Sequence, residues 1–162
     1  MILITGGERS GKSRLALELA LKKGEKRAFI ATAEAIDEEM SSRIAKHKEE
    51  RGNLFVTYEE PLDIHEILKK TGDYDVVVVE CMTTWLGNLF HYGRNTEEMV
   101  EKFIGSINGN EIIVSNEIGM GVIPENPITR TFVEALGRLN ARIAQIADEV
   151  YFVVSGIGVK IK

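Results

Sequence analysis

Residues 6–13 combine glycines with a lysine and a serine at a spacing that can bind phosphate. They satisfy the pattern G-x-x-x-x-G-K-[ST]. An apolar run at residues 1–4 precedes them and an amphipathic stretch follows, and this strand-loop-helix context argues against a chance match. Glycines let backbone N–H groups turn toward phosphate oxygens, and the first turn of a helix adds the positive end of its dipole. The pattern predicts a nucleoside triphosphate site, with Lys12 at the β- and γ-phosphates and Ser13 at Mg²⁺. The loop consists of Gly6, Gly7, Glu8, Arg9, Ser10, Gly11, Lys12 and Ser13.

An acidic side chain follows the most apolar segment of the chain. P-loop enzymes need a carboxylate to manage the metal ion, usually at the end of a buried strand next to the loop strand. Residues 76–79 are four valines, and Glu80 comes directly after them. Because ligands bind at the carboxyl ends of strands in open α/β sheets, we expect Glu80 to hold Mg²⁺ or to orient a nucleophile. A solvated glutamate at a strand end is the alternative.

A histidine between two arginines is the third candidate for chemistry. His47 lies four residues after Arg43 and four before Arg51, so the three side chains share one face of a predicted helix. Neighbouring guanidinium groups disfavour a second positive charge on the imidazole and can hold phosphate. A neutral imidazole beside bound phosphate is a plausible nucleophile. A surface histidine on a charged helix is the alternative, because Glu49 and Glu50 dilute the basic patch.

The elements that must position these residues alternate between strand and helix. The valines at 76–79 are apolar on both faces, as in a central parallel strand covered by helices. The pattern predicts an α/β fold: one P-loop NTPase-like domain over residues 1–162, with a doubly wound, mostly parallel sheet, helices on both faces and a short C-terminal edge hairpin. Strands are predicted at 1–5, 27–31, 54–58, 75–80, 111–115 and 149–154. Helices are predicted at 12–23, 36–51, 62–70, 83–91, 96–107 and 128–147.

Composition narrows the class of protein. The net charge of −5 argues against a broad nucleic-acid surface. The single cysteine, Cys81, cannot form an internal disulfide and is predicted to be a small buried residue at a strand end, which fits a reducing compartment. The N-terminus shows no signal-like segment, and no apolar run has the length of a membrane span. We therefore expect a cytoplasmic protein without stable membrane insertion.

A long segment at residues 115–127 follows the strand predicted at 111–115. Its glycines, prolines and polar groups suit a functional loop at the same edge of the sheet, although it could also be a simple connection. Met120, Val122 and Ile123 are apolar residues within it. They could contact a partner subunit or form a wall for a substrate.

Taken together, these motifs resemble one family, the bifunctional adenosylcobinamide kinase/adenosylcobinamide-phosphate guanylyltransferases of cobalamin biosynthesis. Ordinary P-loop kinases share only the first motif, whereas this resemblance runs from the first residue to the last. The segments that carry it are 2–13, 29–33, 37–48, 80–85, 115–121 and 154–160.

The resemblance implies an enzyme with two successive activities. It would phosphorylate the terminal hydroxyl of adenosylcobinamide with ATP or GTP. It would then transfer GMP from GTP through a guanylyl-histidine to give adenosylcobinamide-GDP. The family's guanylylated histidine matches His47, while Lys12 and Glu80 would assist catalysis and Ser13 and Glu80 would hold Mg²⁺. The resemblance also implies a homotrimer.

The resemblance carries over a set of nucleotide contacts as well. Glu59 is the least secure of them, because Glu60 beside it could take the same role. Glu8 departs from the family pattern, where a small residue is usual. Its negative charge should point outward or pair with Arg9, since triphosphate affinity would otherwise suffer. The implied contacts beyond the phosphate loop are Ala31, Thr32, Ala33, Lys48, Glu49, Glu50, Arg51, Glu59 and Glu80.

Two other functions stay open from the residues themselves. The chain could be a P-loop kinase or nucleotidyltransferase for a different alcohol, because no residue pattern specifies a corrinoid. Trp85, Met82 and Met120 form the apolar platform suited to a flat macrocycle. The chain could instead be a regulatory nucleotide-binding module, but such a module would not need a nucleophilic imidazole at His47.

Overall fold

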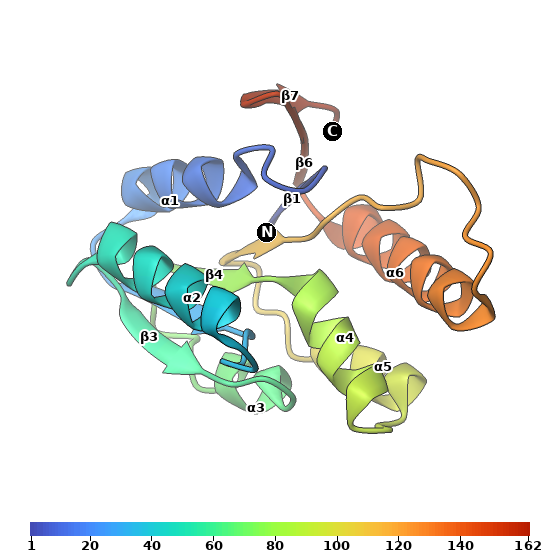
Figure 1. Ribbon diagram of the computed structural model, residues 1–162. Helices are drawn as coiled ribbons and strands as arrows, with labels where there is room; N and C mark the ends of the chain where they lie inside the picture. The colour runs from blue at the N-terminus through green and yellow to red at the C-terminus, as the bar shows by residue number, and fades with distance from the viewer.

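The computed structural model describes residues 1–162, with the exception of the side chains of Arg43 and Glu50. Within this described part the strands form one seven-stranded sheet in the order β3-β2-β4-β5-β1-β6-β7 (Figure 1). The strands are β1 (Ile2–Gly6), β2 (Arg27–Ala31), β3 (Val56–Glu59), β4 (Val76–Glu80), β5 (Glu111–Val114), β6 (Glu149–Val154) and β7 (Ile157–Lys160). The helices are α1 (Lys12–Lys23), α2 (Glu38–Arg51), α3 (Ile64–Leu68), α4 (Met82–His91), α5 (Thr96–Ile104) and α6 (Pro127–Ile146).

The direction of the strands confirms the predicted fold class. Strands β1 to β6 run parallel, and only β7 pairs antiparallel, with β6. The glycine turn near the C-terminus thus ends in the edge hairpin that the sequence predicts. Among the described residues, no helix combines the length and apolarity that crossing a bilayer requires.

The apolar residues of the central strands fill two cores, one on each face of the sheet. Val76 and Val78 of β4 pack with Ala16 and Ala20 of α1, whereas the alternate valines of the strand point to the opposite face. That second face is covered by α4, α5 and α6, whose apolar side chains include Trp85. Because both faces of β4 are buried, an unbroken apolar run is what this position requires.

Predicted element boundaries are accurate to within a few residues, with α3 the main exception. Helix α3 spans five residues rather than the nine predicted at 62–70. The turn before it is closed by Glu60, whose Oε1 accepts hydrogen bonds from the backbone N–H groups of Leu62 and Asp63. Helix α2 begins two residues later than predicted, because Asp37 is its N-cap and accepts from Met40 N at 2.7 Å.

The strand predicted to lie beside the phosphate-loop strand is not its neighbour in the sheet. We expected the strand ending in Glu80 to lie next to β1, but β5 lies between β1 and β4. Helix α1 packs across β1, β5 and β4, so its first turn still reaches the end of β4. Strand order depends on how the crossover helices pack, and this long-range information is absent from local patterns.

Candidate active site

The phosphate loop connects β1 to α1 and needs glycine at both ends. A Cβ atom on Gly6 would lie 2.2 Å from the carbonyl oxygen of Val153, and Gly11 has φ +99°. Only glycine accommodates such a close approach and adopts such a conformation at low cost. The loop therefore folds as a compact turn that opens directly onto the first turn of α1.

Lys12 lies in this loop and is almost buried. Its Nζ donates a hydrogen bond to the carbonyl oxygen of Gly7 at 2.7 Å. Burial lowers the pKa of Lys12, while the charges of Glu8, Cys81 and Glu80 act in the opposite direction. The ammonium is thus poorly hydrated, which strengthens its interaction with an incoming phosphate.

The C-terminal hairpin supports the phosphate loop from behind. The backbone N–H of Gly156, in the turn between β6 and β7, donates to the carbonyl oxygen of Ser10 at 3.0 Å. Arg14 of α1 donates through Nη2 to the carbonyl oxygen of Gly156 at 3.2 Å. These contacts give a structural reason for the glycine-containing segment at the end of the chain.

Glu80 faces the first turn of α1. Ser13 Oγ donates a hydrogen bond to Glu80 Oε1, and Glu80 is largely buried at the end of β4. A hydroxyl and a carboxylate side by side are the oxygen ligands with which P-loop proteins bind Mg²⁺. The two residues predicted as metal ligands are therefore in contact with each other.

Thr32 and Cys81 hold the backbone around Glu80. Thr32 Oγ1 donates to the carbonyl oxygens of Glu80 and Cys81 and accepts from Cys81 N at 2.8 Å. Cys81 is partly rather than fully buried, and it caps α4 by accepting from Thr84 N at 3.3 Å. Burial of the thiol raises the pKa of Cys81. The cysteine is thus a structural cap beside the site, a role that the sequence does not reveal.

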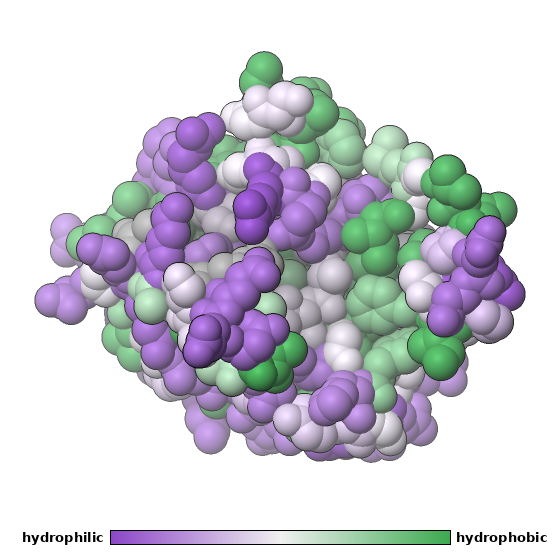
Figure 2. Space-filling model, in the orientation of Figure 1, coloured by the Kyte–Doolittle hydropathy of each residue, from purple (hydrophilic) through white to green (hydrophobic). Residues whose placement is uncertain are grey.

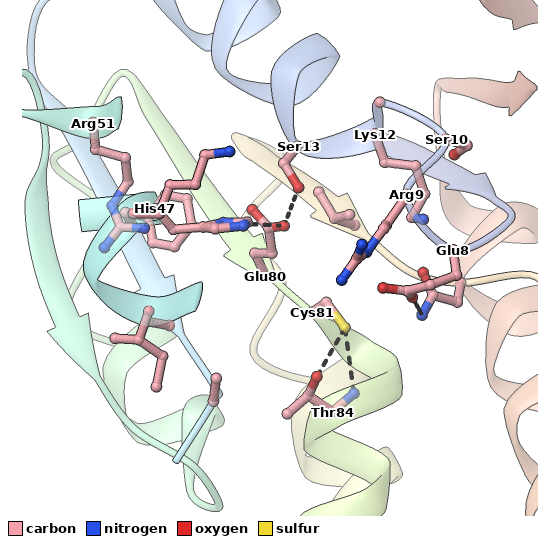
Figure 3. Close-up of a pocket in the computed structure, with 18 of the residues that line it drawn as sticks. Glu8, Arg9, Ser10, Lys12, Ser13, His47, Arg51, Glu80, Cys81 and Thr84 are labelled. Carbon is pink, nitrogen blue, oxygen red and sulfur yellow. Dashed lines mark hydrogen bonds and ion pairs between the residues drawn. The ribbon is translucent and has the colours of Figure 1, made fainter. Parts of the chain in front are cut away.

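His47 projects from α2 toward Glu80. Its Nδ1 lies 4.0 Å from Glu80 Oε1, and the side chain is 39% exposed (Figure 3). The imidazole is therefore close to the predicted metal ligands yet accessible from solvent. The interpretation from sequence placed it between guanidinium groups, whereas the structure adds a carboxylate beside it.

Arg51 lies on the same helix but in a different environment from the one its spacing suggests. It is 4% exposed, and its guanidinium carbon lies 3.9 Å from the centre of the Phe29 ring. This stacking fixes the cation in the wall of the site. Arg43, the other arginine predicted to flank the imidazole, lies outside the described side chains.

One cavity of about 560 Å³ connects the phosphate loop, the end of β4 and α2 (Figure 3). Most of the predicted site residues line it. Gly6, Gly7 and Thr32 do not, but the carbonyl oxygen of Gly7 accepts from Lys12 Nζ and Thr32 Oγ1 donates to the carbonyl oxygen of Glu80. The residues that line it are Glu8, Arg9, Ser10, Gly11, Lys12, Ser13, Phe29, Ala31, Ala33, Met40, Ile44, Lys46, His47, Arg51, Glu80, Cys81, Thr84, Val114 and Asn116.

Three further predicted nucleotide contacts lie outside this cavity: Lys48, Glu49 and Glu59. Lys48 and Glu59 form an ion pair with each other that joins α2 to the end of β3, and neither lines the cavity. Glu49 is exposed on α2. The side chain of Glu50 lies outside the described residues. Because Glu60 closes the turn before α3, Glu59 is the glutamate of the two that faces α2.

Glu8 is exposed, as we expected, yet it also lies at the phosphate site. It lines the cavity, and its Oε2 accepts a hydrogen bond from Asn116 Nδ2 at 3.0 Å. Arg9 instead lies 3.9 Å from Glu39 of α2, in a contact between two exposed side chains. The loop thus presents a carboxylate to its own phosphate site.

The prediction that Trp85, Met82 and Met120 form an apolar platform for a flat macrocycle is wrong. Trp85 and Met82 are fully buried in the core, and the indole N–H of Trp85 donates to the carbonyl oxygen of Leu62 at 2.7 Å. Only Met120 of that trio is exposed, together with Val122, which is 95% exposed, and Ile123. In Figure 2 hydrophobic residues gather over this part of the molecule, between β5 and α6.

Several lining residues carried no signal as ligands in the sequence. Met40 and Ile44 share the His47 face of α2, as helical spacing predicts, although spacing does not mark apolar side chains as ligands. Phe29 alternates with Ala31 on β2 and could have been found by the two-residue period of a strand. Asn116 and Thr84 lie in segments that carry the family resemblance, but their place in the cavity depends on how β5 and α4 pack.

Comparison with known proteins gives a family match over almost the whole chain. A family model described as cobinamide kinase / cobinamide phosphate guanyltransferase matches residues 2–161. The bifunctional adenosylcobalamin biosynthesis protein CobU of Escherichia coli (strain K12) is 38% identical over 181 residues, which cover 100% of this chain and 99% of the relative. The bifunctional adenosylcobalamin biosynthesis protein CobP of Pseudomonas aeruginosa is 39% identical over 167 residues, covering 99% and 96%.

A solved structure shows the same fold at low sequence identity. The flagellar accessory protein FlaH from Methanocaldococcus jannaschii aligns with a TM-score of 0.50 and 15% identity, over 98% of this chain and 74% of FlaH. At that level of identity the likeness concerns the arrangement of strands and helices alone.

Proposed function

This chain belongs to the cobinamide kinase / cobinamide phosphate guanyltransferase family, and from that premise we propose that both transfer reactions take place in the cavity described above. One observation carries the proposal: the phosphate loop, the Ser13–Glu80 pair and the His47 imidazole all face the same space. A nucleotide held by the loop would lie within reach of both kinds of nucleophile.

In the first reaction the terminal hydroxyl of adenosylcobinamide attacks the γ-phosphorus of ATP or GTP. The bond from that phosphorus to the β,γ-bridging oxygen breaks, the nucleoside diphosphate leaves, and the hydroxyl proton passes to water. Loop N–H groups and the Lys12 ammonium stabilise the charge on the transferred group and on the leaving diphosphate. The poor hydration of Lys12 supports this role.

In the second reaction the His47 imidazole attacks the α-phosphorus of GTP and pyrophosphate leaves. An oxygen of adenosylcobinamide phosphate then attacks the same phosphorus, the P–N bond breaks, and adenosylcobinamide-GDP forms with the imidazole restored. Glu80, 4.0 Å from Nδ1, can orient the ring and balance the positive charge that develops on it.

Ser13 and Glu80 are the residues that would hold Mg²⁺. Their hydroxyl and carboxylate oxygens suit this ion, which commonly takes only one or two protein ligands and completes its shell with phosphate and water. Bound there, Mg²⁺ would neutralise negative charge on the phosphates.

Incubation with GTP labelled at the α-phosphate tests the proposal directly. The protein should retain the label in an acid-labile, base-stable adduct, and peptide mapping should place it on His47. Addition of adenosylcobinamide phosphate should discharge the label as adenosylcobinamide-GDP. Discharge to a different alcohol phosphate alone would instead favour another substrate for this site.

Glu80→Gln is expected to lower Mg²⁺-dependent turnover about 10- to 100-fold, because the amide keeps the shape of the carboxylate and loses its charge. The amide oxygen can still accept the hydrogen bond from Ser13, so the fold should persist. A Mg²⁺ titration of both activities measures the effect.

Glu149→Gln is the matched control for this substitution, since Glu149 begins β6 at the opposite edge of the parallel sheet. Its Mg²⁺ dependence should equal that of the wild-type protein. An unchanged Mg²⁺ dependence in Glu80→Gln itself would assign the metal to other residues.

The exposed apolar loop that contains Met120, Val122 and Ile123 is the surface to which we assign a partner subunit or the corrinoid. Both occupants would bury this surface, and the implied homotrimer remains part of the proposal. Sedimentation of the protein with and without adenosylcobinamide distinguishes the two occupants. Association of subunits through this loop does not need added ligand, whereas binding of the corrinoid does.

A further inference from the structure

Strand β5 ends between the phosphate-loop strand and the strand that carries Glu80. Asn116 lies two residues beyond Val114, the last paired residue of β5, and therefore emerges between the two groups that manage the triphosphate. Asn116 lines the nucleotide cavity. Its carboxamide is a hydrogen-bond donor at a point where phosphate oxygens would arrive.

The backbone of Asn116 is fixed from two helices. Its N–H donates to Thr83 Oγ1 of α4 at 2.9 Å, and its carbonyl oxygen accepts from Asn140 Nδ2 of α6 at 3.0 Å. Asn140 is buried and is held in turn by Ser115, whose Oγ donates to Asn140 Oδ1 at 2.6 Å. These contacts involve the main chain of Asn116, so its side chain is positioned without being needed for the fold.

The side chain of Asn116 donates to an anion in this structure. Its Nδ2 lies 3.0 Å from Oε2 of Glu8, which also lines the cavity. Glu8 and Lys12 line the same cavity, so Glu8 brings a carboxylate to the site in which Lys12 would contact the β- and γ-phosphates.

We propose that Asn116 contacts the γ-phosphate, and that the Glu8 carboxylate and a γ-phosphate oxygen compete for its amide N–H. This inference rests on the proposed function, of which it identifies a further catalytic residue. When a triphosphate binds, Nδ2 donates to the phosphate and Glu8 turns away. In Figure 3 Glu8 and His47 lie on opposite sides of the Ser13–Glu80 pair. The contact therefore serves the γ-transfer step more than attack by His47 on the α-phosphate.

Asn116→Ala tests the contact while keeping both main-chain hydrogen bonds. We expect its affinity for a GTP analogue with an imido β,γ-bridge to fall about tenfold and its affinity for GDP to change less than about twofold, because only the analogue carries a γ-phosphate. The rate of γ-transfer should fall about 10- to 100-fold, and the loss in labelling of His47 should be much smaller. Calorimetry and single-turnover assays provide these values.

Two further variants sharpen the test. Glu8→Ala should strengthen binding of the imido analogue several-fold, since it removes both a repulsive charge and the competitor for Asn116. In the Asn116→Ala background the gain should be smaller, because there is no donor left to release. Asn95→Ala is the matched control, as it removes an exposed hydrogen bond that Asn95 Oδ1 accepts from Glu98 N, outside the cavity.

The outcomes separate this inference from the proposed function. Equal losses for analogue and GDP in Asn116→Ala, or no loss for either, would overturn the γ-phosphate contact. If the wild-type protein fails to phosphorylate adenosylcobinamide but Asn116→Ala still loses affinity for the analogue alone, the proposed function is wrong and the contact stands.

Discussion

Replacement of His47 with alanine is expected to abolish GMP transfer while phosphorylation of adenosylcobinamide continues. The second reaction needs a nitrogen nucleophile that forms a covalent intermediate, whereas in the first the substrate hydroxyl attacks. The imidazole lies 4.0 Å from Glu80 in the cavity, so its loss also removes a group beside the metal ligands, and the kinase rate should fall by no more than about tenfold. Labelling from α-labelled GTP and separate assays of the two products measure both effects.

The control for this variant is His91→Ala, which removes an exposed imidazole at the end of α4, outside the cavity. Both of its activities should match the wild-type protein. If His47→Ala still took up label and formed adenosylcobinamide-GDP, the nucleophile would lie elsewhere. Lys46 would then be the first candidate, because it lines the cavity, whereas Lys48 is paired with Glu59.

Lys12→Ala is expected to lower both activities by at least about 10²- to 10³-fold. Its ammonium would stabilise the charge on the γ-phosphate in one reaction and on the departing pyrophosphate in the other. Because burial lowers the pKa of Lys12, both activities should also decline on the alkaline side before pH reaches the ordinary lysine value of 10.5. Steady-state rates for each reaction between neutral and alkaline pH provide the measurement.

Lys22→Ala is the matched control, since Lys22 is an exposed residue of the last turn of the same helix. It should change neither rate. A loss confined to one activity in Lys12→Ala would mean that the two reactions use different phosphate sites.

Local patterns in the sequence were sufficient to predict the helices, the strands and the phosphate loop. The four valines of β4 are buried on both faces, and the period of apolar residues in α1 places Ala16 and Ala20 against them. Glycine spacing predicted the phosphate loop because its constraint is local: Gly11 has φ +99°, a conformation that glycine adopts at low cost. Such features depend on neighbours in the chain or on the regular period of a strand or helix.

Features that depend on packing between distant segments could not be predicted. Nothing in the local pattern places β5 between β1 and β4, and therefore nothing indicates that Asn116 meets Glu8. Arg51 was predicted from helical spacing, but its burial against Phe29 requires knowledge of how α2 lies on the sheet. The prediction that Trp85 faces a substrate is wrong for the same reason, since α4 turns this side chain into the core.

The burial of Trp85 makes the protein its own optical probe of folding. It is the single tryptophan of the chain, fully buried, hydrogen-bonded to Leu62 and in contact with the ring of Phe103. Its emission should lie at short wavelength in the native protein and shift to the red when water reaches the indole. Because it does not line the nucleotide cavity, intrinsic fluorescence can follow the unfolding of any site variant with little signal from bound nucleotide.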